Sequence, residues 1–226
     1  TRPTVLPPAT DLTEFLALEK TAAETGSQTV LFVGRLEPRK GIGLLLDAWS
    51  RIASGQVPLP QGLKMPRLVV AGSGELEKAV AAESRRLGDA LLHHVPAPDR
   101  KHLLRLMSEA SIAVSPALHG ESFGIVLVEA LASGTPIIAS SNAGYVNVLS
   151  GTGRELLVPP GNADALAGKI VELLANEDKR QSLAIWGREH ARQFDVSTVV
   201  PRFEEVYRAA LANYARSKAL GVGNQA

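Results

Sequence analysis

The sequence has no cysteine, which excludes disulfides, thiolate metal ligands and a cysteine nucleophile. Aromatic residues are scarce at 4%, so a surface that stacks nucleobases is not expected. The 24 Lys and Arg face 23 Asp and Glu, and the net charge of +1 gives no field for holding nucleic acid or an anionic membrane. No apolar run reaches about 18 residues, because Glu129 interrupts the longest one, so no segment is expected to span a bilayer. We therefore expect a cytoplasmic protein without a nucleic-acid partner.

The residues that are present suit a packed core. Hydrophobic residues make up 45% of the 226 and charged residues 21%. At roughly 150 residues per domain, the length predicts one large domain or one domain with appendages. The chain opens with Thr1 rather than Met and no signal-peptide pattern follows, so we expect a piece of a longer polypeptide.

Short β-branched runs alternate with amphipathic helical stretches from residue 29 onward. Each run is bounded by Gly or Pro, as is typical of buried parallel strands. The runs cover residues 29–33, 67–71, 111–115, 135–139 and 156–158, with a weaker one at 90–95. Between them, apolar residues recur at the spacing of a helix with one buried face. The sequence thus predicts an α/β fold, a doubly wound parallel sheet of about six strands with right-handed crossovers.

The two ends of the chain differ from this pattern. Residues 1–26 are rich in Pro and Thr and are predicted to be an inter-domain segment, so the domain itself is expected to cover residues 27–226. C-terminal helices are expected from about residue 180, over 180–193 and 199–217. The stripe Phe203–Tyr214 in the second helix is apolar and must be covered, by a neighbouring domain or by a dimer partner.

The candidate site lies in the loops at the carboxyl ends of the strands, where doubly wound sheets bind ligands. The loop after Val33 reads GRLEPRKGIG, a strand-to-helix turn that carries three cations. Arg35 and Lys40 are predicted to bind an anion there, the guanidinium as a planar fork and the ammonium as a point charge. The alternative is a solvated basic loop in which Arg39 or Lys40 pairs with Glu37.

A second loop, PALHGESFGIVLVEALASGTP over residues 116–136, gives a sharper signal. Ser122 is predicted to be the N-cap of a helix that runs through Leu131. Three backbone amides would then point outward at the positive end of the helix dipole and form a seat for phosphate. These amides belong to Phe123, Gly124 and Ile125.

Two acids flank this seat. Glu121 precedes the expected helix, and Glu129 lies eight residues later, which at 1.5 Å per residue separates them by roughly 12 Å. On that scale one carboxylate reaches a sugar on one side of a diphosphate, and the other reaches a ribose on the far side. Glu129 stands among apolar residues, so its charge needs hydroxyl or cationic partners. The alternative for Glu129 is a structural salt bridge or a capping contact.

Other ligand motifs are missing from the sequence. Gly72-Ser73-Gly74 follows a strand but lacks the third glycine of the dinucleotide fingerprint, so it predicts a tight turn at the rim of the site. No P-loop, Gly-x-Ser-x-Gly or His-Glu-x-x-His pattern occurs, and the histidines lack carboxylates at metal-ligand spacing. We expect neither a metal nor another cofactor.

Taken together, these residues resemble the carboxy-terminal half of the retaining GT-B glycosyltransferases of family 4. The likeness rests on the Arg/Lys loop followed by the E-x7-E pattern that begins at Glu121, and it extends over nearly the whole chain. Residues 5–15 and the stretch LLVPPGN at 156–162 are similar to the family as well. Residues 120–140 look especially like those of the bacterial phosphatidylinositol mannosyltransferases.

The resemblance implies the Rossmann-like, donor-binding half of a GT-B fold. Such an enzyme transfers a hexose from a GDP- or UDP-sugar with retention of configuration and typically without a metal. By position, Arg35, Lys40, Ser122 and the three amides after Ser122 would bind the donor diphosphate. Glu121 would be the catalytic residue that orients the donor sugar, and Glu129 would bind the ribose.

The chain departs from the family pattern at three places. Asn147 stands where an acid is usual, Glu155 where glycine is common, and the loop 93–98 lacks its usual glycine, which leaves the base open. The family's acceptor-binding domain precedes this half and is missing from the sequence. Because domain closure completes the catalytic geometry, we expect weak donor binding and little or no transferase activity from the chain alone. Peripheral membrane association of the full-length protein is compatible with the resemblance.

Two other functions are open at this stage. One is a dinucleotide-dependent oxidoreductase domain, which the fold alone favours and the missing third glycine opposes. The other is a non-catalytic nucleotide-binding scaffold descended from transferases, which Asn147 supports.

Overall fold

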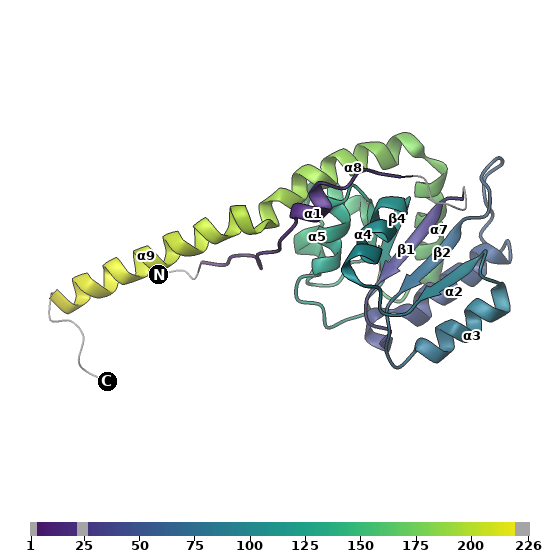
Figure 1. Cartoon of the computed structure of the whole chain (residues 1–226), viewed down its shortest axis with the longest axis horizontal. Helices are drawn as coiled ribbons and strands as arrows, with labels where there is room; N and C mark the ends of the chain where they lie inside the picture. The colour runs from purple at the N-terminus through teal and green to yellow at the C-terminus, as the bar shows by residue number, and fades with distance from the viewer. Residues whose placement is uncertain (1–3, 22–26, 220–226) are drawn as a thin grey trace.

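The fold is built on one parallel sheet (Figure 1). The computed structural model describes residues 4–21 and 27–219. The strands are β1 (Thr29–Val33), β2 (Arg67–Ala71), β3 (Leu92–Val95), β4 (Ile112–Ser115), β5 (Ile137–Ser140) and β6 (Leu157–Val158). Their order is β3-β2-β1-β4-β5-β6 and every neighbouring pair is parallel. The predicted doubly wound α/β sheet of about six strands is confirmed, and its switch point lies between β1 and β4.

Helices cover both faces of the sheet. On one face α2 (Ile42–Ala53) packs against α7 (Ala163–Ala175), and on the other α5 (Ile125–Ala132) packs against α8 (Glu177–Ala191). Helix α3 (Glu77–Leu87) packs against β3, and α4 (Arg100–Glu109) packs against β1. The shorter elements are α1 (Thr13–Leu16), α6 (Tyr145–Val148) and the 3-10 turns η1 (Pro38–Lys40), η2 (Gly151–Leu156) and η3 (Arg192–Phe194).

The sequence patterns explain which surfaces are buried. Every residue of β4 and β5 is buried, as the continuous apolar runs of strands covered on both faces predict. In α2, the stripe Ile42, Leu45 and Trp49 is at most 1% exposed. Asn162 and Asn176 are the N-caps of α7 and α8, and the side chain of each accepts a hydrogen bond from the amide three residues later.

Some boundaries differ from the prediction for reasons of hydrogen bonding. β5 begins at Ile137 rather than at residue 135, because the Thr135 amide donates to Ala130 O at 2.9 Å and the Thr135 hydroxyl donates to Met107 O at 3.0 Å. The first C-terminal helix begins at Glu177 rather than at about 180, because Asn176 caps it. The last helix, α9, runs over Val196–Ala219 and starts before the predicted residue 199.

The predicted inter-domain segment contributes to the core where it is described. Leu12 and Phe15 are fully buried. The Thr10 amide donates to Phe194 O at 3.0 Å, and the Val196 amide donates to Thr10 O at 2.9 Å. The segment is thereby tied to the start of α9. The division of the chain at residue 26 stays a prediction, and part of that segment lies outside the described residues.

Helix α9 extends away from the rest of the molecule (Figure 1). Its apolar stripe is uncovered within the described chain, with exposures from 37% to 70% for Phe203, Val206, Tyr207, Leu211 and Tyr214. None of the helices within residues 4–21 and 27–219 combines the length and apolar content needed to cross a bilayer.

Candidate functional site

The loops that follow β1 and β4 meet at the carboxyl edge of the sheet. Gly41 is in the left-handed region at φ 75°, and a Cβ at this position would lie 2.0 Å from the carbonyl oxygen of Pro116. The Leu118 amide donates to Arg39 O at 2.8 Å. Only glycine combines this φ with so close an approach of two backbones. The contact brings the charged side chains of both loops within reach of one another.

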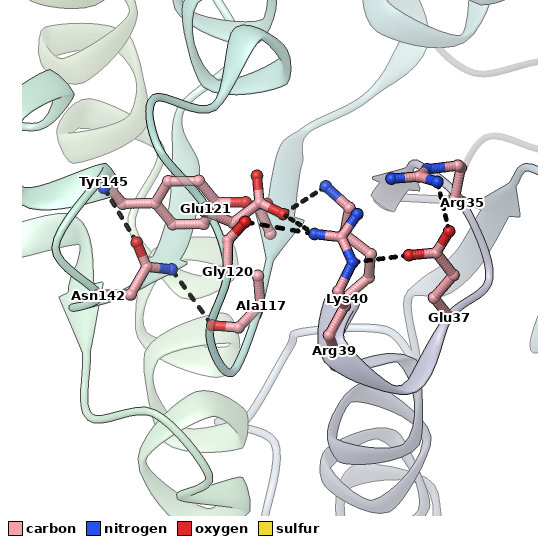
Figure 2. Close-up of polar contacts among 10 residues, drawn as sticks. Arg35, Glu37, Arg39, Lys40, Ala117, Gly120, Glu121, Asn142 and Tyr145 are labelled. Atoms are coloured by element: carbon pink, nitrogen blue, oxygen red, sulfur yellow. Dashed lines mark hydrogen bonds and ion pairs between the residues drawn. The ribbon is translucent and has the colours of Figure 1, made fainter.

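An alternating row of charges, which we name the charge chain, crosses this contact (Figure 2). Its members, in order, are Arg35, Glu37, Arg39, Glu121 and Lys40. Glu37 pairs with Arg35 Nη1 at 2.6 Å and with Arg39 Nε at 2.7 Å. Glu121 Oε1 accepts from Arg39 Nη1 at 3.1 Å and from Lys40 Nζ at 2.5 Å. With three cations and two carboxylates, the row carries one net positive charge and is suited to an anion.

The structure separates the two cations that the sequence grouped together. Lys40 contacts Glu121 directly, whereas the Arg35 side chain is 66% exposed and turns toward Glu37. The alternative pairing of Arg39 with Glu37 is also present. The bond from Arg39 to Glu121 was missed, because two adjacent cations in a turn give no signal of which one faces inward.

Glu121 is held by α6, which the sequence did not connect to the site. Its side chain is 9% exposed, and a Cβ at Gly144 would lie 2.3 Å from the Glu121 carbonyl oxygen. Tyr145 lies beside it, with its hydroxyl 2.8 Å from Ser115 Oγ (Figure 2). Burial, with a smaller contribution from the Glu121 carboxylate, raises the pKa of Tyr145 to about 12. Asn142 fixes this arrangement by accepting from the Tyr145 amide at 3.0 Å.

The start of α5 corrects one prediction. Ser122 is not the N-cap: the helix begins at Ile125, and the N-cap position belongs to Gly124 at φ 97°, with no side-chain capping bond. A Cβ at Gly124 would lie 2.5 Å from Cε1 of Tyr145, so packing against α6 requires glycine here. Phe123 and Gly124 therefore precede the helix. The amides at its positive end that lack an intrahelical acceptor begin with Ile125 and Val126.

Glu129 lies on α5 with its side chain 17% exposed. Burial raises the pKa of the Glu129 carboxyl, and Arg100 partly offsets this effect. Arg100 Nη1 is 3.9 Å away, too far for a hydrogen bond, and Arg100 Nε pairs instead with Glu14 at 2.7 Å. The guanidinium also lies over the ring of Phe15, 4.5 Å from its centroid. A half-satisfied buried carboxylate at the ligand edge can accept hydrogen bonds from hydroxyl groups.

An open cleft of about 490 Å³ adjoins the charge chain. Its lining residues are Arg35, Glu37, Pro38, Arg39, Ser73, Gly74, Glu75 and His119. A Cβ at Gly72 would lie 1.9 Å from Gly34 O, and one at Gly74 would lie 2.8 Å from Leu36 N. These glycines therefore allow the turn at the rim to pack closely against the backbone of the loop after β1. They are not needed to make room for a dinucleotide.

The positions that depart from the family pattern lie away from the charge chain. Asn147 is exposed on α6, and its amide donates to Ala143 O at 3.0 Å. Glu155 precedes β6, hence lies at the opposite edge of the sheet, and pairs with Lys179 at 2.8 Å. The predicted loop 93–98 is a loop only after Val95, because residues 93–95 belong to β3, where His94 Nε2 lies 3.0 Å from Gly72 O.

The donor set at this site consists of cations and backbone amides, which suits phosphate oxygens. Within the two described ranges, no three His, Asp or Glu side chains gather as a metal ion would require. That the reaction needs no metal stays a prediction.

Comparison with known proteins connects this geometry to a family. A family model described as glycosyl transferases group 1 matches residues 16–190. The chain is 35% identical over 184 residues to a phosphatidyl-myo-inositol mannosyltransferase of Mycobacterium leprae, covering 80% of this chain and 46% of that protein. It is 34% identical to a D-inositol 3-phosphate glycosyltransferase of Jonesia denitrificans, covering 73% and 39%.

A solved structure shares the architecture. Sucrose-phosphate synthase from Thermosynechococcus elongatus superimposes with a TM-score of 0.73 at 29% identity, over 92% of this chain and 52% of that one. The chain spans about half the length of each of these proteins, or less.

Proposed function

The chain belongs to the glycosyl transferases group 1 family, and from that premise we propose that it is the donor-binding half of a hexosyltransferase. The donor is a GDP- or UDP-sugar, and the hexose is transferred with retention of configuration. The observation that carries this proposal is the contact of Lys40 with Glu121 beside the start of α5. An ammonium paired with a carboxylate that stands four residues before the positive end of a helix suits a sugar linked to a diphosphate.

Each part of the site has a role in this proposal. Arg35 and Lys40 bind the diphosphate, with Ser122 and the amides of Phe123, Gly124 and Ile125. These groups stabilise the negative charge that develops on the leaving diphosphate when the glycosidic bond breaks. Glu121, fixed by two cations, orients hydroxyl groups of the donor sugar. Glu129, with its buried and poorly paired carboxylate, accepts from the hydroxyl groups of the ribose.

Catalysis in this proposal requires a second domain. The chain spans 46% of the length of its Mycobacterium leprae relative. By the GT-B resemblance, the acceptor is bound by a second domain that precedes this one and closes over it. The chain alone binds the donor weakly and has little or no transferase activity. The exposed stripe of α9 is covered by that domain or by a second copy of the chain.

Isothermal titration calorimetry of the chain with UDP, GDP, ADP and NAD tests the donor class. We expect one of the nucleoside diphosphates to bind and NAD to give no heat. Binding of NAD in preference to every nucleoside diphosphate would instead favour the oxidoreductase interpretation. The sugar conjugates of the nucleotide that binds then identify the donor.

A further inference from the structure

Every cation of the charge chain is already paired in the free protein. Arg35 holds Glu37, Lys40 holds Glu121, and Arg39 holds both acids. A diphosphate that enters the cleft therefore does not meet free guanidinium groups. It must either join these ion pairs or replace one of the carboxylates.

The two carboxylates differ in how firmly they are held. Glu121 is 9% exposed, its carbonyl packs on Gly144, and its carboxylate is enclosed with Tyr145. The Glu37 side chain is 24% exposed. Glu37 directly precedes η1, and its backbone is extended, with φ −112°. Its carboxylate is held by Arg35 and Arg39, and the first of these is 66% exposed. Exposed ion pairs are weak, so Glu37 is the carboxylate that can be exchanged.

We propose that the Glu37 carboxylate occupies the place of a diphosphate oxygen in the free protein and is displaced when the donor binds. This inference rests on the proposed function, because it assigns the competitor for the same diphosphate. Glu37 lines the cleft and already holds the two guanidinium groups that face it. Once Glu37 leaves, three cations face one remaining carboxylate, and the local charge rises from one net positive charge to two.

Because a ligand must displace its carboxylate, Glu37 determines which anions can bind in the cleft. A ligand must bridge both arginines to compete with an acid that already bridges them. Pyrophosphate carries more oxygens and more negative charge than a single phosphate, so it competes with the carboxylate more strongly. Glu37 thereby lowers the affinity for small anions and favours the diphosphate.

The test compares Glu37→Gln with Glu75→Gln. Glu75 lines the same cleft, and within the described chain it has no ion pair, so its substitution removes the same charge without freeing an arginine. Inorganic pyrophosphate, titrated by calorimetry at low salt, is the probe. We expect E37Q to bind pyrophosphate about tenfold more tightly than the unsubstituted chain, the scale of two exposed ion pairs. We expect E75Q to gain only about twofold from the general field.

A gain in E37Q no larger than that in E75Q, or a loss, overturns the inference, because Glu37 would then orient the arginines in the complex. Absence of pyrophosphate binding in every variant overturns it too. Glu37→Ala repeats the test with a side chain that cannot accept from the arginines, and circular dichroism checks that each variant is folded.

A parallel titration with UDP and GDP separates this inference from the proposed function. If E37Q gains for pyrophosphate but no nucleoside diphosphate binds more tightly than pyrophosphate, the nucleotide assignment fails and the exchange of Glu37 stands. If the unsubstituted chain binds a nucleoside diphosphate and E37Q does not gain, the exchange fails and the proposed function stands.

Discussion

Lys40 and Glu121, which are 81 residues apart in the sequence, are joined by a bond of 2.5 Å between Nζ and Oε1. The bond crosses from the loop after β1 to the loop after β4, the strands on either side of the switch point. The sheet order therefore determines this pairing, because only neighbouring strands bring the two loops together.

Glu121→Gln tests the proposed catalytic role, in a full-length transferase that joins this chain to the acceptor-binding domain proposed above. The substitution keeps the size of the side chain and removes the charge that faces the donor sugar. We expect transferase activity to fall about 100-fold or more. Glu155→Gln is the matched control, because Glu155 is also a paired acid but lies at the opposite edge of the sheet. Equal activities of the two variants would refute the role of Glu121.

Gly41→Ala tests the contact between the two loops. A Cβ at this position would lie 2.0 Å from Pro116 O at a φ of 75°, so we expect a loss of about 2 kcal/mol or more in the free energy of unfolding. Gly43→Ala serves as the control, because Gly43 is in α2 with nothing within 4 Å of its Cβ. There we expect a gain of up to about 1 kcal/mol. Urea denaturation of both variants measures the difference, and equal changes would contradict the contact.

Glu129 is predicted to make the stability of the fold fall as the pH rises. Its pKa in the folded protein lies above the usual 4.5, mainly through burial, so between these values the folded state binds more protons than the unfolded state. Glu129→Gln removes this contribution to the pH dependence of the free energy of unfolding. We expect E129Q to gain stability relative to the unsubstituted chain as the pH goes from 4 to 7, while its affinity for the nucleotide falls.

Thermal unfolding at several pH values, together with calorimetry, measures both effects. A variant that loses stability at pH 7 would show that Glu129 is a structural salt bridge with Arg100. If Glu129 binds the ligand, the E129Q variant should gain stability and lose affinity for the nucleotide.

The stripe on α9 is predicted to drive self-association of the isolated chain. Phe203 and Leu211 are exposed by 37% and 68%, and replacement of both by serine removes apolar surface without altering the sheet. We expect sedimentation velocity to show a concentration-dependent dimer for the unsubstituted chain and a monomer for the double variant. Glu205→Ser, on the opposite side of the helix, should leave the dimer intact. If the unsubstituted chain is a monomer at every concentration, self-association through the stripe is refuted, and the proposed acceptor-binding domain remains as its partner.

The sheet could be predicted because each buried strand appears in the sequence as a short apolar run between Gly and Pro. The two loops could be identified because parallel strands present their carboxyl ends at one edge. The pairing inside the site could not be predicted to the same depth. Whether Arg39 or Arg35 reaches Glu121 depends on the turn η1, whose geometry is set by Pro38 and Gly41 together with the contact to Pro116.

The start of α5 shows a second limit. Ser122 has the residue type of an N-cap, yet the helix begins after Gly124 because the chain must pass close to the ring of Tyr145. That constraint comes from α6, more than 20 residues later, and local propensity cannot reveal it. Tyr145 and Asn142 were missed for the same reason.

The most direct test of the account is the affinity of the chain and of its Lys40→Ala variant for the nucleoside diphosphate that binds best. Lys169→Ala is the control, because Lys169 is also a paired lysine, held by Glu172 at 2.7 Å on α7. We predict that K40A loses about tenfold or more in affinity and that K169A retains it. Equal affinities of K40A and the unsubstituted chain would contradict a diphosphate site between the loops after β1 and β4.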